Sequence, residues 1–153
     1  MITLLQTPYD INAQNDLVRT TLLTKKISQS HPGIGPHSCW AGIAFYQNGE
    51  IKIQTGFSQM KNELEQSPYK NSWVKYHGEL AGLAQAIEVI MGNGHQGGQL
   101  FPIVGVYIEM SPCGKCGPAL QNLLPDGTTV LYSFDYATQK AAWEKAATDL
   151  CKA

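Results

Sequence analysis

Two of the four cysteines in the chain stand three residues apart, as Cys113 and Cys116 in the segment EMSPCGKCGPAL. A pair at this spacing can bind a metal ion, form a redox disulfide, or be two small apolar residues that happen to be close. At the start of a helix, positions i and i+3 share one face and the helix dipole favours thiolates. The choice among these chemistries depends on which other residues can join the pair.

A zinc site needs more than two thiolates, and the segment YHGEL supplies a candidate third ligand. His77 and Glu79 open a stretch rich in Ala and Leu that predicts a helix over 77–94. One His and two Cys leave a fourth position for a water molecule, whose pKa zinc lowers to near neutral. A carboxylate close to that water can take its proton and pass it to a leaving group. The expected zinc ligands are His77, Cys113 and Cys116, with Glu79 as the proton carrier.

The hydrophobic pattern alternates between helices and strands along most of the chain. Helices are expected within 10–29, 77–94, 113–124 and 135–153, and strands on both sides of Asn48-Gly49 within 39–57, within 100–110, and within 125–134. The order α-β-β-α-β-α-β-α contains no linker or repeat, so we expect one α/β domain over 1–153. Strand-to-helix crossovers in an open sheet bring helix starts to the same sheet edge, which would bring the two predicted helix starts at 77 and 113 together.

Composition sets broad limits on function. The chain has 153 residues and a net charge of −1, so no general positive field indicates nucleic acid, although a binding groove needs only local charge. No apolar run approaches the roughly 20 residues of a membrane span, and the N-terminus lacks the pattern of a signal peptide. Four unevenly placed cysteines do not indicate a disulfide framework. We therefore expect a cytoplasmic protein with reduced thiols and no membrane partner.

The combination of HGE and PCGKC resembles the H-x-E…P-C-x-x-C signature of the zinc-dependent cytidine deaminase superfamily. The resemblance extends from the predicted hairpin to the last helix. It implies a three-layer α/β/α fold around a central mixed sheet of four to five strands. It also implies that His77, Cys113 and Cys116 bind Zn²⁺ while Glu79 carries protons during attack on an amino-bearing ring carbon.

Other interpretations of the cysteine pair remain open. A thioredoxin-type redox pair would also follow a strand, but it usually has no His-x-Glu partner. A structural zinc site would require a fourth ligand, and neither Cys39 nor Cys151 is well placed for that role; both are expected to be buried or half-buried thiols. A non-catalytic zinc protein would have no need of the carboxylate of Glu79.

Two substrate classes compete within this resemblance. The segment SPCGKC is similar to that of deaminases acting on free nucleosides, but TGFSQMKNE does not clearly supply their Asn-x-Glu motif. The segment VLYSFDYATQKAAWEKA resembles the aromatic, acidic loop and following helix of the AID/APOBEC group, and LLPDG resembles bacterial toxin deaminases. We expect deamination of cytosine in a polynucleotide, with single-stranded DNA favoured and RNA as a further candidate; a cytidine or deoxycytidine deaminase is the alternative. A toxin domain would act in the cytoplasm of a target cell and have an immunity protein as partner.

Several residues near the predicted zinc edge are candidates for substrate contact. Phe134 and Tyr136 alternate where the last strand ends, and a base stacked on such a ring gains about 1–3 kcal/mol. His37 belongs to the Gly-rich loop HPGIGPH, which is expected to be exposed at the pocket mouth. The expected substrate-binding residues are Ser111, Phe134, Tyr136, Trp73 and His37.

Overall fold

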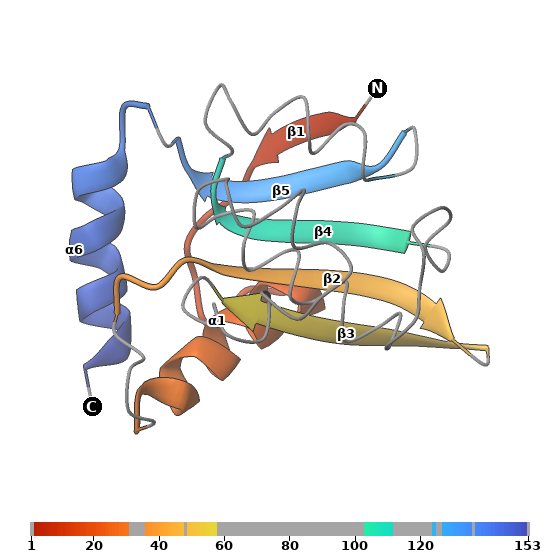
Figure 1. Ribbon diagram of the computed structural model, residues 1–153, viewed down its shortest axis with the longest axis horizontal. Coiled ribbons are helices and arrows are strands. Elements are labelled where there is room, and N and C mark those ends of the chain that lie inside the picture. Colours follow the sequence, from red (N-terminus) through yellow and green to blue (C-terminus); the bar gives the residue numbers. More distant parts are fainter. Residues whose placement is uncertain are drawn as a thin grey trace, which may run out of the picture.

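The described residues form a five-stranded mixed sheet with helices packed against it (Figure 1). The computed structural model describes residues 2–30, 36–47, 49–57, 103–111, 124, 127–135 and 137–152. The strands are β1 (Thr3–Gln6), β2 (Trp40–Gln47), β3 (Glu50–Phe57), β4 (Ile103–Met110) and β5 (Thr129–Phe134). The helices are α1 (Asp16–Ile27), the 3₁₀ turn η1 (Ser28–Ser30) and α6 (Lys140–Cys151). The expected α/β class and mixed sheet are confirmed.

The strand order is β1-β5-β4-β2-β3, so strands from the beginning of the chain flank strands from its end. β1, β5 and β4 run parallel, while β2 is antiparallel to both β4 and β3. The carboxyl ends of β1, β3, β4 and β5 therefore lie at the same edge as the amino end of β2. We call this the carboxyl edge of the sheet.

The expected hairpin is confirmed as β2 and β3, which pair from Trp40 and Phe57 to Gln47 and Glu50. Gly49 has a φ of +79°, the left-handed conformation that a two-residue hairpin turn requires and that glycine adopts without steric penalty. β1, in contrast, was not expected from the sequence. Its four residues are all exposed, and its register with β5 is set by partners more than a hundred positions away.

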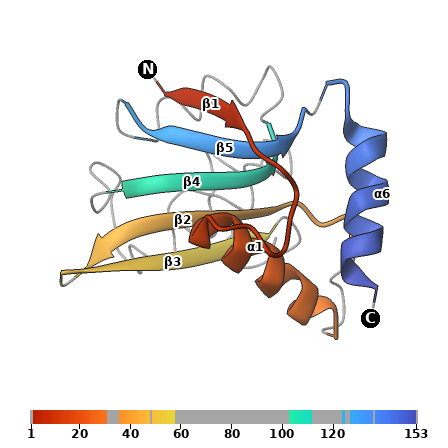
Figure 2. The ribbon, with the colours of Figure 1, turned by 180° about the vertical axis from the view of Figure 1, so that it is seen from behind.

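α1 lies on one face of the sheet, in front of β2 and β3 in Figure 2, and it also contacts β4. It begins at Asp16 rather than near residue 10, because the side chain of Asn15 caps it by accepting from the backbone N–H groups of Leu17 and Val18 at 2.9 and 3.2 Å. Gly42 lets α1 come close to β2, since a Cβ there would lie 2.2 Å from Thr21 Oγ1.

α6 lies along the carboxyl edge, across the direction of the strands (Figure 1). It begins at Lys140, later than expected, because Ala137, Thr138 and Gln139 first donate hydrogen bonds back to Asp135. No helix among the described residues is long and apolar enough to cross a membrane.

Apolar side chains are buried on both faces of the sheet. The cluster beneath α1 comprises Leu17, Val18, Leu22, Ala44 and Tyr107. Strand alternation places another set on the opposite face, all buried: Ala41, Ile43, Phe45, Val106, Ile108, Met110 and Val130. The predicted helices over 77–94 and 113–124 lie outside the described residues, apart from Leu124, which is buried.

Candidate functional site at the carboxyl edge of the sheet

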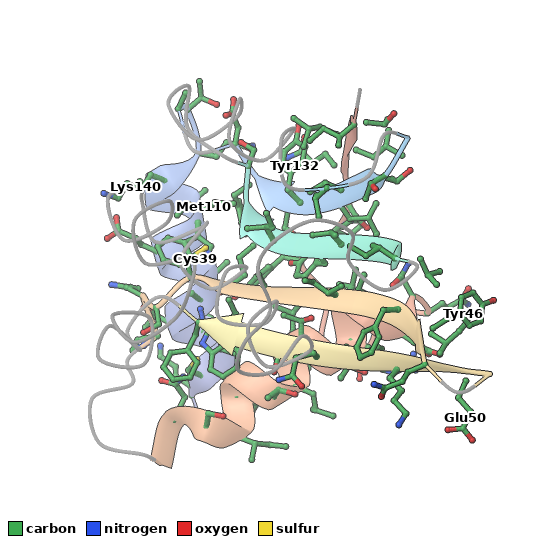
Figure 3. All side chains as sticks on the ribbon, turned by 45° about the vertical axis from the view of Figure 1, so that its right-hand side comes forward. Cys39, Tyr46, Glu50, Met110, Tyr132 and Lys140 are labelled. Atoms are coloured by element: carbon green, nitrogen blue, oxygen red, sulfur yellow. The ribbon has the colours of Figure 1, made fainter. Side chains whose placement is uncertain are left out.

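The carboxyl edge is where β4 leads into the Cys113–Cys116 segment and β5 leads into the predicted aromatic loop. Figure 3 shows Met110, at the end of β4, on the same side as Cys39 and Lys140, while Tyr46 and Glu50 mark the hairpin at the other end. Of the predicted site residues, Ser111, Phe134 and His37 are described. The others lie outside the described residues: Trp73, His77, Glu79, Cys113, Cys116 and Tyr136.

Ser111 connects the end of β4 to the end of β5. Its backbone N–H donates to the Phe134 carbonyl at 2.8 Å, and its hydroxyl donates to Asp135 Oδ1 at 3.3 Å. The residue is only 8% exposed. The strand exit that precedes the predicted zinc ligands is therefore fixed against the loop that was predicted to contact substrate.

Asp135 organises that loop. Its carboxylate accepts hydrogen bonds from the Ala137 backbone N–H at 3.1 Å and from the Thr138 hydroxyl at 2.9 Å. These two donors, in that order, and the Ser111 hydroxyl hold the pKa of Asp135 below its usual value. Gln139 Oε1 accepts from the Asp135 backbone N–H at 2.8 Å. The start of the loop is thus set by hydrogen bonds to an ionised carboxylate.

Phe134 is half-buried, and its ring centroid lies 5.2 Å from that of Tyr9 at an interplanar angle of 59°. Such a tilted pair is a favourable aromatic geometry. The ring therefore contributes to packing on the Tyr9 side while part of it remains accessible at the edge.

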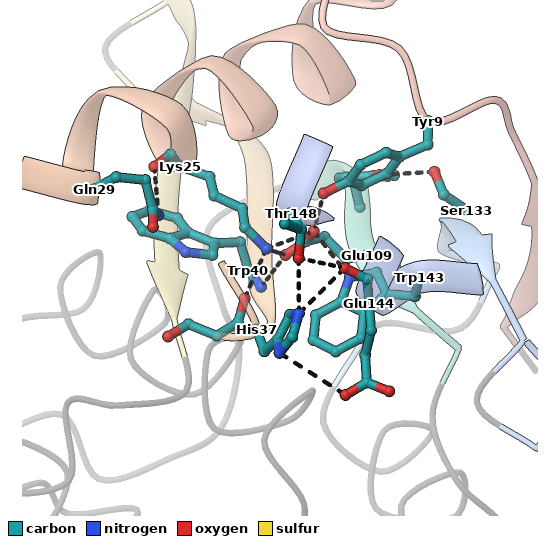
Figure 4. A network of polar contacts seen from close by, with 12 residues as sticks. Tyr9, Lys25, Gln29, His37, Trp40, Glu109, Ser133, Trp143, Glu144 and Thr148 are labelled. Carbon is teal, nitrogen blue, oxygen red and sulfur yellow. Dashed lines mark hydrogen bonds and ion pairs between the residues drawn. The ribbon is translucent and has the colours of Figure 1, made fainter. Parts of the chain in front are cut away.

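His37 also lies at the carboxyl edge, just before β2, and it is exposed as expected. Its Nε2 is 3.2 Å from the Glu144 carbonyl and 3.1 Å from Thr148 Oγ1, and its ring packs against Trp143 at a centroid distance of 5.8 Å (Figure 4). In this structure, the ring links the segment before β2 to α6.

A buried charge network beneath this edge was not predicted. Lys25 and Glu109 are both fully buried, with Lys25 Nζ 2.9 Å from each carboxylate oxygen and 2.9 Å from the Ser38 carbonyl. Three more donors complete the shell of the Glu109 carboxylate: the Trp40 backbone N–H at 2.8 Å, the Tyr9 hydroxyl at 2.5 Å and Trp143 Nε1 at 3.1 Å (Figure 4). This one carboxylate thus joins α1, β2, α6 and the segment after β1 to β4.

Two tyrosines near Glu109 are held in the neutral form. Burial first, and then the negative charge of Glu109, raise the pKa of Tyr9 far above its usual value. Burial likewise raises the pKa of Tyr107, whose hydroxyl is 2.7 Å from Ser133 Oγ. The Glu109 network therefore contains one ionised pair, with neutral donors completing its shell.

The other cysteines match expectation: Cys39 is buried and Cys151 half-buried. Burial, the largest cause, raises the pKa of the Cys151 thiol, as expected for a packed rather than reactive thiol. Within the described ranges, no three His, Cys, Asp or Glu residues are grouped so that they could hold a metal ion. The predicted zinc ligands all lie outside those ranges.

No protein-family model matches this sequence, and comparison with curated proteins and with solved structures found no match.

Proposed function

We propose that this chain is a zinc-dependent deaminase that converts cytosine to uracil in a polynucleotide, with single-stranded DNA as the favoured substrate. The proposal rests on the joint occurrence of His77-x-Glu79 and Cys113-x-x-Cys116. A cytidine deaminase-like three-layer fold is part of the same proposal, and the mixed sheet buried on both faces is compatible with it.

The observation that supports this function most directly is the position of Ser111 at the carboxyl edge. Two peptide units separate Ser111 from Cys113, so chain geometry keeps their Cα atoms within about 7 Å of one another. The proposal therefore puts its first zinc ligand of this segment two residues after Ser111, which directly follows β4. Ligands in open α/β sheets bind at such an edge, outside the carboxyl ends of the strands.

The donor set fits zinc by its chemistry. Thiolates are soft ligands and imidazole is a borderline one, and together they select zinc over magnesium or calcium. His77, Cys113 and Cys116 would hold the metal. When bound, zinc supplies the lowered pKa that makes water a nucleophile near neutral pH.

Glu79 would carry the protons of the reaction. One water is consumed and one ammonia released: the water oxygen bonds to C4 of cytosine, and the bond from C4 to the amino nitrogen breaks. Glu79 would take one proton from the water and deliver it to N3 of the base, and it would then pass the second proton of the water to the amino group, which leaves as ammonia.

The element after β5 favours a polynucleotide substrate. An Asp135-centred turn and then α6 follow β5, as in the nucleic-acid deaminases that this segment resembles, whereas a nucleoside deaminase would more often continue into another strand. The half-buried ring of Phe134 offers a surface on which a base could stack. A free-nucleoside deaminase remains the second candidate, because the Ser-Pro-Cys-Gly-x-Cys segment is similar to that class.

A substrate panel tests the proposal. Purified protein should be incubated separately with cytidine, single-stranded DNA, duplex DNA and RNA of the same sequence, and uracil measured by chromatography and sequencing. We expect uracil in single-stranded DNA. Deamination of cytidine together with no deamination of any polynucleotide would favour the free-nucleoside deaminase instead. A bacterial-toxin origin would further predict an immunity protein that blocks the activity.

A further inference from the structure

A shallow hollow of about 370 Å³ lies beside the candidate site, where β1 and β5 end. Its lining consists of Gln6, Thr7, Pro8, Tyr9, Ser133 and Phe134. Most of this lining comes from the N-terminal segment, which the proposed function does not use. We refer to it as the Gln6–Phe134 hollow.

Hydrogen bonds to β5 hold the N-terminal wall of the hollow in place. The Thr7 backbone N–H donates to the Tyr132 carbonyl at 2.8 Å, which continues the pairing of β1 with β5 for one more residue. The Tyr9 hydroxyl is anchored on Glu109 at 2.5 Å. Contacts with the sheet therefore hold residues 6–9, the N-terminal wall of the hollow, at both of its ends.

The chemistry of this lining suits a flat, neutral ring that carries hydrogen-bond donors. Tyr9 and Phe134 present aromatic rings, and the lining residues that the structure describes include no charged side chain. Gln6 Nε2 donates to the Ser133 carbonyl and to Gln139 Oε1, each at 3.0 Å, which fixes the amide plane. No donor among the described residues reaches Gln6 Oε1, so this oxygen is available to accept from a ligand.

The hollow is next to the strand exit that leads to the proposed zinc ligands. Phe134 pairs with Met110 in the β4–β5 register, and its carbonyl accepts from the Ser111 backbone N–H. Neighbouring strands are about 4.8 Å apart. A ring bound in the hollow would therefore be one or two strand spacings from the exit of β4, which suits a base next to the target base.

We infer that the Gln6–Phe134 hollow binds an unpaired nucleobase flanking the target cytosine, and that Gln6 is a specificity-determining residue for that base. The inference rests on the proposed function, because a flanking base exists only in a polynucleotide. Stacking on the rings tolerates any base, whereas the Gln6 carbonyl selects the bases that direct an N–H donor toward it.

The test uses two full-length variants and one control. Gln6→Leu keeps a side chain of similar length but removes the carbonyl acceptor, and Phe134→Leu keeps an apolar side chain but removes the ring. Thr3→Ala, at the exposed far end of β1, is the control. Each is assayed on single-stranded oligonucleotides randomised around one cytosine, with sequencing of the products, and on free cytidine.

We expect Gln6→Leu to change the flanking-base preference at least threefold, and Phe134→Leu to lower kcat/KM on oligonucleotides about tenfold, with Thr3→Ala unchanged. Turnover of free cytidine measures the basal activity, and Thr3→Ala should leave it unchanged. Unchanged context and rate in both variants, with the wild type active on oligonucleotides, would overturn the inference and leave the proposed function intact.

A binding measurement keeps the inference testable without turnover. Fluorescence anisotropy of a labelled single-stranded pentanucleotide should give a Kd that rises about tenfold in Phe134→Leu relative to Thr3→Ala. If no polynucleotide is deaminated but this difference in Kd is found, the proposed reaction is wrong and the nucleobase site stands. If the pentanucleotide does not bind, or binds all variants equally, the hollow is not a nucleobase site.

Discussion

Replacing Lys25 by methionine should strongly destabilise the protein. Lys25 and Glu109 are fully buried, and the ammonium contacts both carboxylate oxygens at 2.9 Å. Removing one partner of a buried ion pair typically costs about 3–5 kcal/mol, because the other charge is left in a low-dielectric interior. Three neutral donors still reach Glu109 in Lys25→Met, so we expect a loss near the lower end, about 3 kcal/mol.

A double-mutant cycle isolates the pair from the loss of packing. Glu109→Gln should also lose about 3 kcal/mol, since its amide group would face the donors of Tyr9 and Trp143 and leave the Lys25 ammonium without a counter-charge. Lys25→Met combined with Glu109→Gln buries no charge. We expect the double variant to be less destabilised than the sum of the single variants by about 1–3 kcal/mol.

Urea unfolding followed by tryptophan fluorescence measures these differences as changes in the midpoint and slope of the transition. Lys26→Met is the matched control: it is the next residue on α1, it is exposed, and its stability should stay within about 0.5 kcal/mol of wild type. A loss below about 1 kcal/mol in Lys25→Met, or strictly additive losses in the double variant, would refute the assignment of Glu109 as a buried charge held by Lys25.

Four further predictions concern the site and its surroundings. Metal analysis of the purified protein should find about one zinc per chain, and Cys113→Ala should lose most of it; full retention would contradict the ligand assignment. Glu79→Ala should keep its zinc and lose nearly all deamination, because proton transfer is removed while the ligands remain; wild-type turnover would exclude it as the proton carrier. Tyr136→Ala should alter the neighbouring-base preference and lower kcat/KM on oligonucleotides about tenfold; an unchanged preference would show that Tyr136 does not contact the neighbouring base. The pKa of Tyr9 is raised in the folded state, so its contribution to the free energy of unfolding is fully present below the unfolded pKa of about 10 and falls by up to about 1.4 kcal/mol per pH unit above it. Urea unfolding at several pH values from 9 to 11 should show that the free energy of unfolding decreases less steeply with pH in Tyr9→Phe than in wild type. An equally steep decrease would count against this coupling.

Elements with a local signal could be predicted from the sequence. The Asn48-Gly49 turn between two apolar runs marked the β2–β3 hairpin, and the run over 100–110 marked β4. Helix boundaries were less accurate at the N-termini. The Asn15 side chain caps α1 by accepting from two backbone N–H groups, and a turn centred on Asp135 precedes α6. Both features depend on single side chains rather than on a period.

Contacts between distant parts of the chain could not be predicted in the same way. β1 is four residues long, has no alternating pattern, and exists because β5 pairs with it. The Lys25–Glu109 pair joins residues 84 positions apart. A signal was nevertheless present: Glu109 is a lone charge in an apolar strand, and Lys25 falls on the buried stripe of α1, so each required a buried partner.

For the predicted site, the sequence indicated the residues of the site better than it indicated the residues that surround and position them. Ser111 and Phe134 do lie together at the carboxyl edge, joined by a 2.8 Å hydrogen bond, as the predicted strand ends suggested. Asp135, which fixes the loop, and the Gln6 side of the edge were missed. The role of Gln6 depends on hydrogen bonds that cross from β1 to Ser133 and Gln139, and no spacing within the sequence encodes those.

The interleaved strand order has a consequence for how the protein forms during synthesis. β1, β2 and β3 leave the ribosome before β4 and β5, and β1 is separated from β2 in the sheet by β5 and β4. Among the described elements, those before β4 can form α1 and the β2–β3 hairpin, whereas β1 cannot pair before β5, which ends at residue 134, has been synthesised. Lys25 likewise lacks its carboxylate until Glu109 in β4 has been synthesised. Since contacts of such large sequence separation slow folding, we expect the sheet to close only after residue 134 has been synthesised.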